Sequence, residues 1–280
     1  MKRPIPQARW QDFSEAETLL GFRNHGMFAE VLREPITPLG AHYLLIHFDV
    51  PQLSDENYTL TIAGRVRTPL QIGLGELKTR PSVTQLVTME CAGTGRILLK
   101  PRPVYVPWAD AAAGTYRWTG TPLRPLLEQA GLLDDAVEIL FSGWDTGVDL
   151  GIEHAFERSL PVADALRPEV MLAWAANDQP LLPEHGFPLR LIVPSWYGVA
   201  SVKWLRAITA LSAPFAGVQQ AQAYRYRQTH DEPRREKRVM SLMVSPGIPD
   251  MMSRCRFIAP GQHVLQGRAW SGVLRWRRSR

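Results

Sequence analysis

One cysteine stands where an apolar run passes into a loop of small residues. Cys91 lies in the stretch "LVTMECAGTGR" (86–96), and Arg96 follows it five residues later. A nearby cation lowers the pKa of a thiol, and the resulting thiolate is a nucleophile or a soft metal ligand. A buried structural thiol is the alternative, because free cysteines are among the most buried residues of proteins. The local sequence leaves both interpretations open.

The other cysteine and the histidines do not complete a familiar site around Cys91. The chain has two cysteines, which cannot form a disulfide framework, so Cys91 and Cys255 each need their own explanation. The seven histidines give no local signature of a catalytic partner, and no further Cys or His stands at zinc-ligand spacing.

A dense set of cationic and hydroxyl side chains follows in "HGFPLRLIVPSWYGVASVKW" (185–204). His185 and Arg190 flank the start of an expected strand, and Ser201 and Lys203 follow a turn that contains Gly198. Such groups around a glycine-containing turn suit an anion such as a phosphate. A hydrogen-bonded structural histidine is the alternative for His185 taken alone.

Two shorter stretches also carry polar residues between hydrophobic ones. "FRNHG" (22–26) joins Arg23, Asn24 and His25, and a solvated turn is the alternative interpretation. "FSGWDTG" (141–147) places Asp145 at an expected strand end, where it would accept hydrogen bonds from a heterocycle or cap a turn.

Strands with scattered short helices must position these residues. Hydrophobic periodicity, Pro and Gly boundaries and β-branched runs predict helices at 14–22, 122–132 and 161–168. The same signals predict strands at 42–51, 58–66, 82–90, 136–143, 170–177, 188–195 and 202–211. The order lacks regular βαβα alternation, so we expect a mixed α+β fold.

The composition is that of a globular protein with a full core. The chain has 280 residues, 45% of them hydrophobic and 21% charged, with a formal net charge of +5. The positive charge favours anionic partners, but no nucleic-acid-binding motif is present. No apolar run approaches a membrane span and the N-terminus has no signal-peptide pattern. We therefore expect a cytoplasmic protein, or a periplasmic one if a leader was removed.

Five ordered stretches together resemble the sulfite oxidase family of molybdenum-cofactor enzymes. They are "FRNHG", "TMECAGTGR", "FSGWDTG", the long stretch from Leu172 to Leu205, and "GRAWSG" (267–272). The resemblance covers roughly residues 20–272 and implies a sulfite-oxidase-type molybdopterin-binding fold followed by a partial immunoglobulin-like β-sandwich. It implies an oxidoreductase domain at 1–230 and a truncated dimerisation domain at 231–280, with the boundary inside the charged run 225–238.

The same resemblance implies a cofactor, molybdenum bound to molybdopterin, and its protein contacts. Cys91 would ligate the metal, since a soft thiolate suits molybdenum. The positions implied to bind the pterin and its phosphate are Phe22, Arg23, Asn24, His25, Asp145, His185, Arg190, Ser201, Val202 and Lys203.

The substrate contacts are implied in the same way. Arg23 and Arg96 would hold an oxyanion with forked guanidinium groups, beside Trp108 and either Tyr224 or Tyr226. The implied reaction is oxygen-atom transfer, with sulfite oxidised to sulfate and electrons passed to an external acceptor, such as a cytochrome c-like protein or a small molecule. A homodimer is a further implied partner.

Two departures from the family pattern keep alternatives open. Thr94-Gly95 replaces the usual Asn-Arg, so one cation near the metal is missing and nitrate or a sulfoxide becomes an alternative substrate. The chain also ends eight residues after Gly272 in "VLRWRRSR", which does not alternate as a strand should. A truncated, non-catalytic molybdopterin-binding protein is therefore a third hypothesis.

Overall fold

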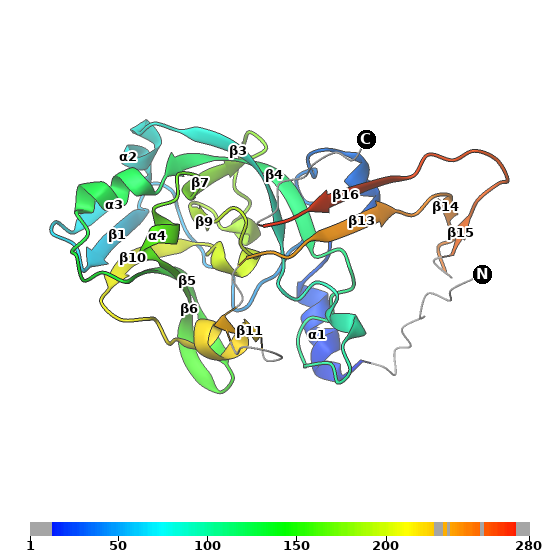
Figure 1. Cartoon of the computed structure of the whole chain (residues 1–280), viewed down its shortest axis with the longest axis horizontal. Coiled ribbons are helices and arrows are strands. Elements are labelled where there is room, and N and C mark those ends of the chain that lie inside the picture. Colours follow the sequence, from blue (N-terminus) through cyan, green and yellow to red (C-terminus); the bar gives the residue numbers. More distant parts are fainter. Residues whose placement is uncertain (1–12, 227–231, 234–235, 253–254, 273–280) are drawn as a thin grey trace.

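Two five-stranded β-sheets form the body of the protein (Figure 1). The computed structural model describes residues 13–226, 232–233, 236–252 and 255–272. The first sheet has the strand order β2-β1-β10-β5-β6, in which β1 and β10 run parallel. The second has the order β3-β4-β7-β8, with β9 also paired to β7, and all its pairs are antiparallel.

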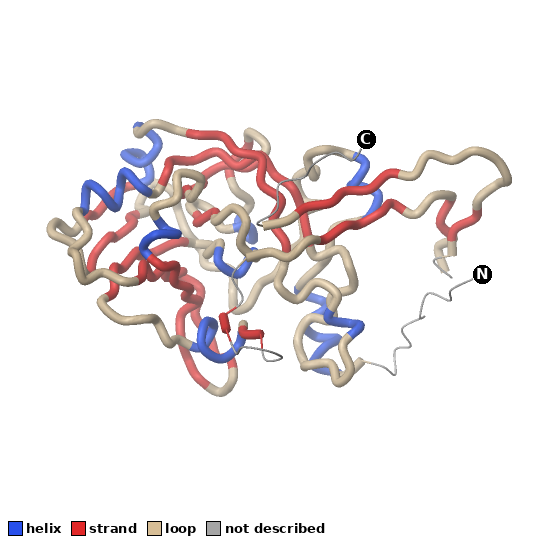
Figure 2. The backbone as a smooth tube through the Cα atoms, in the orientation of Figure 1, coloured by secondary structure: helices blue, strands red, loops and turns tan. Residues whose placement is uncertain are grey.

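Strands dominate the backbone, and the helices are short (Figure 2). The strands of the two sheets are β1 (Thr59–Gly64), β2 (Leu70–Gly73), β3 (Val83–Glu90), β4 (Ala113–Pro122), β5 (Glu138–Asp149), β6 (Ile152–Pro161), β7 (Met171–Ala176), β8 (Gln179–Pro180), β9 (Arg190–Ile192) and β10 (Leu205–Leu211). The α-helices are α1 (Glu15–Arg23), α2 (Leu74–Thr79), α3 (Arg124–Ala130) and α4 (Val162–Ala165). Short 3₁₀ helices span Ala29–Arg33, Arg96–Leu98, Pro183–His185 and Gly198–Ala200, and a π-helical turn spans Gln219–Ala223.

Local sequence signals explain where two of the helices begin and end. Ser14 accepts a hydrogen bond from the backbone of Glu17, whose side chain reaches back to the Ser14 backbone, so α1 starts with a capping box. Pro125 lies in the first turn of α3, and Gly131 ends this helix in the left-handed conformation. Both helices therefore form where the sequence predicts them.

The two sheets share one hydrophobic core, and the second sheet packs a further core on its other face. The first core joins β1, β5, β6 and β10 to α2 and α3 and includes the fully buried Leu60, Ile139 and Ile208. The second lies on β3, β4 and β7 and includes the fully buried Trp118 and Met171. Cys91 belongs to the second core, so the end of β3 is anchored by apolar packing.

The expected α+β class is confirmed, and most expected strands are present, but one is wrong. Residues 42–51 form a loop that makes only an isolated bridge between Leu44 and His25 within the described part of the chain. The apolar side chains that suggest a strand there pack inward from an irregular backbone. Strands β4 and β6 had no counterpart in the sequence-based expectation.

The C-terminal region consists of two ribbons that project from the two sheets (Figure 1). β13 (Met240–Val244) pairs with β16 (Gln266–Trp270), and β14 (Ile248–Pro249) pairs with β15 (Arg256–Phe257). These ribbons fit a partial sandwich. The expected domain boundary at 230/231 and the tail "VLRWRRSR" (273–280) lie outside the described residues. Two described short strands, β11 (Arg225–Tyr226) and β12 (Glu232–Pro233), stand on either side of residues 227–231, which contain the boundary.

Within the described residues, no helix combines the length and apolar character needed to cross a membrane.

Candidate functional site

A cavity lies where the two cores meet. Its walls come from residues 42–47, the end of β3, the middle of β5, the stretch 185–203 and the residue after the π-helical turn. These elements are far apart in the sequence. The cavity brings together seven residues singled out from the sequence: Cys91, Asp145, His185, Arg190, Ser201, Lys203 and Tyr224.

Cys91 directly follows β3 and its side chain faces this cavity. The residue is 4% exposed, and its sulfur accepts a hydrogen bond from the backbone N–H of Gly93 at 3.4 Å. Burial raises the pKa of the Cys91 thiol, while the Gly93 N–H and the charge of Arg96 act in the opposite direction. In the chain by itself, desolvation outweighs the effect of the Arg96 cation on the pKa of this thiol.

Arg96 packs on the loop behind Cys91. Its Nη1 donates to the Val106 carbonyl at 2.7 Å, and its guanidinium lies 5.4 Å from the centre of the Tyr105 ring. A Cβ at Gly93 would overlap the Arg96 guanidinium, so a larger residue there would make this side chain move. Arg96 is not among the residues that line the cavity.

Trp108 lies beside the cysteine on the side of the second core. It is 5% exposed, and its ring meets Tyr43 edge to face at 6.3 Å. The indole N–H helps to lower the pKa of Cys91, yet it makes no regular hydrogen bond within the described part of the chain. Trp108 thus offers an unused donor next to the thiol.

Asp145 and Lys203 form a buried pair of opposite charge at the cavity wall. Asp145 lies inside β5, not at a strand end as expected, at the irregularity between Ser142 and Thr146. Burial raises the pKa of Asp145 and lowers that of Lys203, and each charge partly offsets the shift of the other. The Lys203 ammonium donates to the carbonyls of Leu45 (2.9 Å) and Glu184 (2.8 Å).

Arg190 and Ser201 hold the turns of the cavity wall through the backbone. Arg190 is 4% exposed and donates to the carbonyls of His185 (2.7 Å) and Ser201 (3.0 Å). Ser201 accepts from the Val193 N–H at 3.1 Å. Burial lowers the pKa of His185 to about 2, so this ring is neutral. Val202 is fully buried in the first core, and its side chain does not line the cavity.

The stretch "FRNHG" at the end of α1 does not line the cavity. Phe22 is 80% exposed, and His25 is also exposed. Arg23 donates to the Phe48 carbonyl at 2.5 Å and lies 3.7 Å from the Asp49 carboxylate. Asn24 is buried, but its amide bridges Leu20 and Ile46. The helix end of α1 therefore supports the 44–49 loop from outside.

The loop at 42–47 supplies cavity residues that sequence reasoning missed. His42 is 2% exposed, and burial lowers its pKa to about 4. Nε2 of His47 lies 2.7 Å from the Tyr224 hydroxyl, and burial lowers the pKa of His47 to about 3. The sequence does contain a signal for these residues, namely two histidines five positions apart in "HYLLIHF" (42–48). We interpreted this run as a strand and therefore did not consider its histidines as site residues. Of the two tyrosines weighed, Tyr224 lines the cavity, whereas the side chain of Tyr226 lies outside the described residues.

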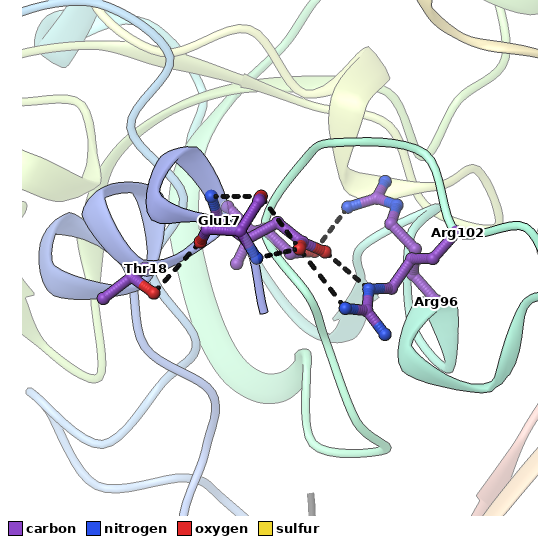
Figure 3. A network of polar contacts seen from close by, with 6 residues as sticks. Glu17, Thr18, Arg96 and Arg102 are labelled. Carbon is purple, nitrogen blue, oxygen red and sulfur yellow. Dashed lines mark hydrogen bonds and ion pairs between the residues drawn. The ribbon is translucent and has the colours of Figure 1, made fainter. Parts of the chain in front are cut away.

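An ion pair ties α1 to the segment that follows Cys91 (Figure 3). Arg102 donates through Nε to Glu17 at 2.5 Å and through Nη2 at 3.2 Å. Glu17 is 5% exposed, and the Arg102 guanidinium holds the pKa of this carboxyl down to about 2. Figure 3 shows Arg96 extending toward the same helix beside Arg102.

Several buried polar atoms around the cavity make no hydrogen bond within the described part of the chain. They include Nε2 of His42, Oδ1 of Asp145, Nε of Arg190 and the hydroxyl of Tyr116. Buried polar groups are normally paired, so such a concentration indicates a polar ligand. Among the described residues, no three His, Cys, Asp or Glu side chains are grouped to hold a metal ion. A metal here would need ligands beyond the protein, which a cofactor supplies.

Comparison with known families gives a match across most of this site. Residues 47–219 match the model of the oxidoreductase molybdopterin binding domain. The matched region includes Cys91, Asp145, His185, Arg190 and Lys203, and it excludes the "FRNHG" stretch.

Nitrate reductases and sulfite oxidases are among the curated relatives. The chain is 35% identical over 181 residues to a nitrate reductase [NADPH] of Phytophthora infestans, covering 62% of this chain and 20% of that protein. It is 31% identical over 259 residues to mitochondrial sulfite oxidase of Mus musculus, covering 85% of this chain and 45% of that protein. The chain thus spans less than half the length of these relatives.

The fold also matches a solved structure over nearly the whole chain. The crystal structure of the sulfane dehydrogenase SoxCD from Paracoccus pantotrophus superposes with a TM-score of 0.73 and covers 97% of this chain and 71% of that one. The sequence identity is 23%, so this comparison establishes the fold alone.

Proposed function

Because this chain belongs to the oxidoreductase molybdopterin-binding domain family, we propose that its cavity binds molybdenum as molybdopterin and carries out oxygen-atom transfer on a small oxyanion. The observation that carries the proposal is a buried thiol, Cys91, in a cavity whose walls hold unpaired polar atoms. A thiolate is a soft ligand suited to molybdenum, and a coordinated thiol loses its proton whatever its pKa in the free chain.

The donors around the cavity fit a pterin with a phosphate. We assign the cofactor contacts to residues that face the cavity: Asp145, His185, Arg190, Ser201 and Lys203, with His42 added. Arg190 and Lys203 offer positive charge in a buried setting, where an anion would be held strongly. Asp145 is an acceptor for ring N–H groups. The assignment leaves out Val202, because its amide donates to the Ala200 carbonyl and its carbonyl accepts from the Leu191 N–H. The assignment does not extend to Phe22, Arg23, Asn24 and His25.

When bound, the metal centre supplies two-electron redox chemistry with transfer of an oxygen atom. The protein's part is to orient the substrate and exclude water. Tyr224 and His47 close one side of the cavity with a hydrogen bond, and Trp108 presents its indole N–H beside Cys91. Arg96 does not line the cavity and its Nη1 is bonded to the Val106 carbonyl, so its role as a substrate ligand requires movement of that side chain.

Sulfite is the first substrate that we propose, with an external electron acceptor, and nitrate is the second. The relatives support both, because the sulfite oxidase match covers more of the chain and the nitrate reductase match has the higher identity. Thr94-Gly95 leaves one cation fewer than sulfite oxidases carry near the metal, which is the feature that favours the second.

Metal analysis of the purified chain, expressed with cofactor supply, tests the proposal. We expect about one molybdenum per chain together with a pterin, and loss of both in the Cys91→Ser variant, with Cys255→Ser as the matched control. A folded chain without molybdenum would contradict the proposal and leave a non-catalytic protein. Assays of sulfite with ferricyanide and of nitrate with reduced viologen then decide between the two reactions.

A further inference from the structure

The end of the described chain folds back onto the strand that carries Cys91. Residues 236–238 and 270–272, here called the C-terminal brace, lie against the edge of β3 that β4 leaves free. The indole N–H of Trp270 donates to the Glu90 carboxylate at 2.7 Å, and the Lys237 ammonium donates to the Thr88 carbonyl. Glu90 is the residue directly before Cys91.

These contacts are buried, unlike most of the C-terminal region. Trp270 is 8% exposed, Lys237 is 5% exposed and Glu90 is 5% exposed. By contrast, the next ribbon exposes Ile248 by 75% and Phe257 by 68%. A hydrogen bond to a buried carboxylate is costly to break, because the carboxylate would be left without its donor.

The same brace also holds the opposite wall of the cavity. The Lys237 backbone N–H donates to the Ser195 carbonyl at 2.9 Å, and Trp196 bridges to Glu236. This loop leads into the cavity residues Gly198 and Ser201.

Gly272 allows the two parts of the brace to meet. Its N–H donates to the Lys237 carbonyl at 3.0 Å. A Cβ at this position would overlap the Ser195 carbonyl and lie 2.8 Å from the Lys237 nitrogen. Any larger residue would therefore push the brace away from the 195–197 loop.

We propose that the C-terminal brace, through Trp270 and Lys237, is a positioning element that fixes the end of β3 relative to the 195–203 loop and so sets where Cys91 stands in the cavity. None of its residues lines the cavity, so they act on Cys91 through the backbone. The role of Cys91 as a ligand rests on the proposed function, whereas its position and accessibility do not.

The test measures how readily Cys91 reacts in the full-length, cofactor-free chain. In a Cys255→Ser background, a maleimide reports Cys91 alone, and amide hydrogen exchange reports residues 91–96 and 198–203. Trp270→Phe removes the N–H donor and keeps an aromatic ring, and Gly272→Val displaces the brace without touching β3. Trp174→Phe, at a half-buried position on β7, is the matched control.

We expect both brace variants to react about tenfold faster than the parent and to exchange faster in both segments, because local opening is easier once a buried bond is lost. The control should react at the parental rate. If folded Trp270→Phe shows the parental rates of maleimide labelling and hydrogen exchange, the proposal is overturned. If Gly272→Val does not fold, the result for Trp270→Phe alone decides. Faster labelling in a protein that never retains molybdenum would overturn the proposed function and leave the brace in place.

Discussion

The hydroxyl of Tyr224 lies 2.7 Å from Nε2 of His47, in a contact between segments 177 residues apart. The His47 ring also packs on Phe156 with centres 4.5 Å apart, and all three side chains line the cavity. Since burial keeps the His47 ring neutral, the pair shares one hydrogen bond and no charge. The 42–47 loop is thus fastened to the residue that follows the π-helical turn.

Removing either partner should loosen this side of the cavity. We expect Tyr224→Phe to lower the free energy of unfolding by about 1 kcal/mol, because only the hydroxyl is lost. In a double-mutant cycle with His47→Leu, the coupling should also be about 1 kcal/mol. Chemical denaturation of the four proteins measures it, and strictly additive effects would show that the contact contributes nothing.

Acid should weaken the fold through the buried His42. Burial lowers the pKa of His42 from 6.5 to about 4, so the unfolded chain binds a proton that the folded chain does not. This contribution to stability is complete above pH 6.5 and is lost as the pH falls toward 4, at about 1.4 kcal/mol per pH unit. Unfolding of the cofactor-free chain between these pH values measures the slope.

The variant His42→Asn should reduce the slope of stability against pH by up to about 1.4 kcal/mol per pH unit, which is the effect of one proton. The amide of the new Asn side chain replaces the hydrogen bond of Nδ1 to the Tyr43 carbonyl. His263→Asn, at an exposed position, is the control and should leave the slope unchanged. Equal slopes in both variants would mean that other groups cause the acid sensitivity.

The ion pair between Glu17 and Arg102 should stabilise the docking of α1. Glu17→Gln keeps a capping box but loses the charge, so we expect a loss of about 1–2 kcal/mol. The stabilisation is present above pH 4.5 and disappears as the pH falls toward 2, because Arg102 lowers the pKa of Glu17 to about 2. The exposed Glu15→Gln in the same helical turn is the control, and thermal unfolding at pH 7 compares them. An equally small effect of both changes would contradict a structural role for the pair.

A methyl group at Gly93 should displace the Arg96 guanidinium. Gly93→Ala places its Cβ against this guanidinium, and the flexible side chain must move from the Val106 carbonyl to make room. We expect a loss of about 1–2 kcal/mol in the free energy of unfolding, the contribution of one hydrogen bond from a charged donor. In an Arg96→Ala background the same change should cost nothing further, because the guanidinium is already absent. Chemical denaturation of the single and double variants decides, and an equal loss in both backgrounds would mean that Gly93 is needed for another reason.

Local sequence patterns determined much of the framework. Ser14 and Glu17 fix the start of α1, Gly131 ends α3, and the β-branched run 83–90 forms β3 with Cys91 directly after it. The polar turn at 185–203 also forms as its residue types suggest. Caps, turns and side-chain alternation act between neighbours in the chain, so the sequence carries them directly.

The tertiary structure alone decided which side chains share the cavity and how they titrate. The family resemblance implied Phe22, Arg23 and His25 as cofactor contacts, and these residues do not line the cavity, whereas His42 and His47 from a loop do. Arg96 alone predicts a lowered thiol pKa at Cys91, but burial raises it. The burial of these groups, and contacts such as the one between His47 and Tyr224, 177 residues apart in the chain, depend on how the two sheets pack. A local pattern of residues does not contain that information.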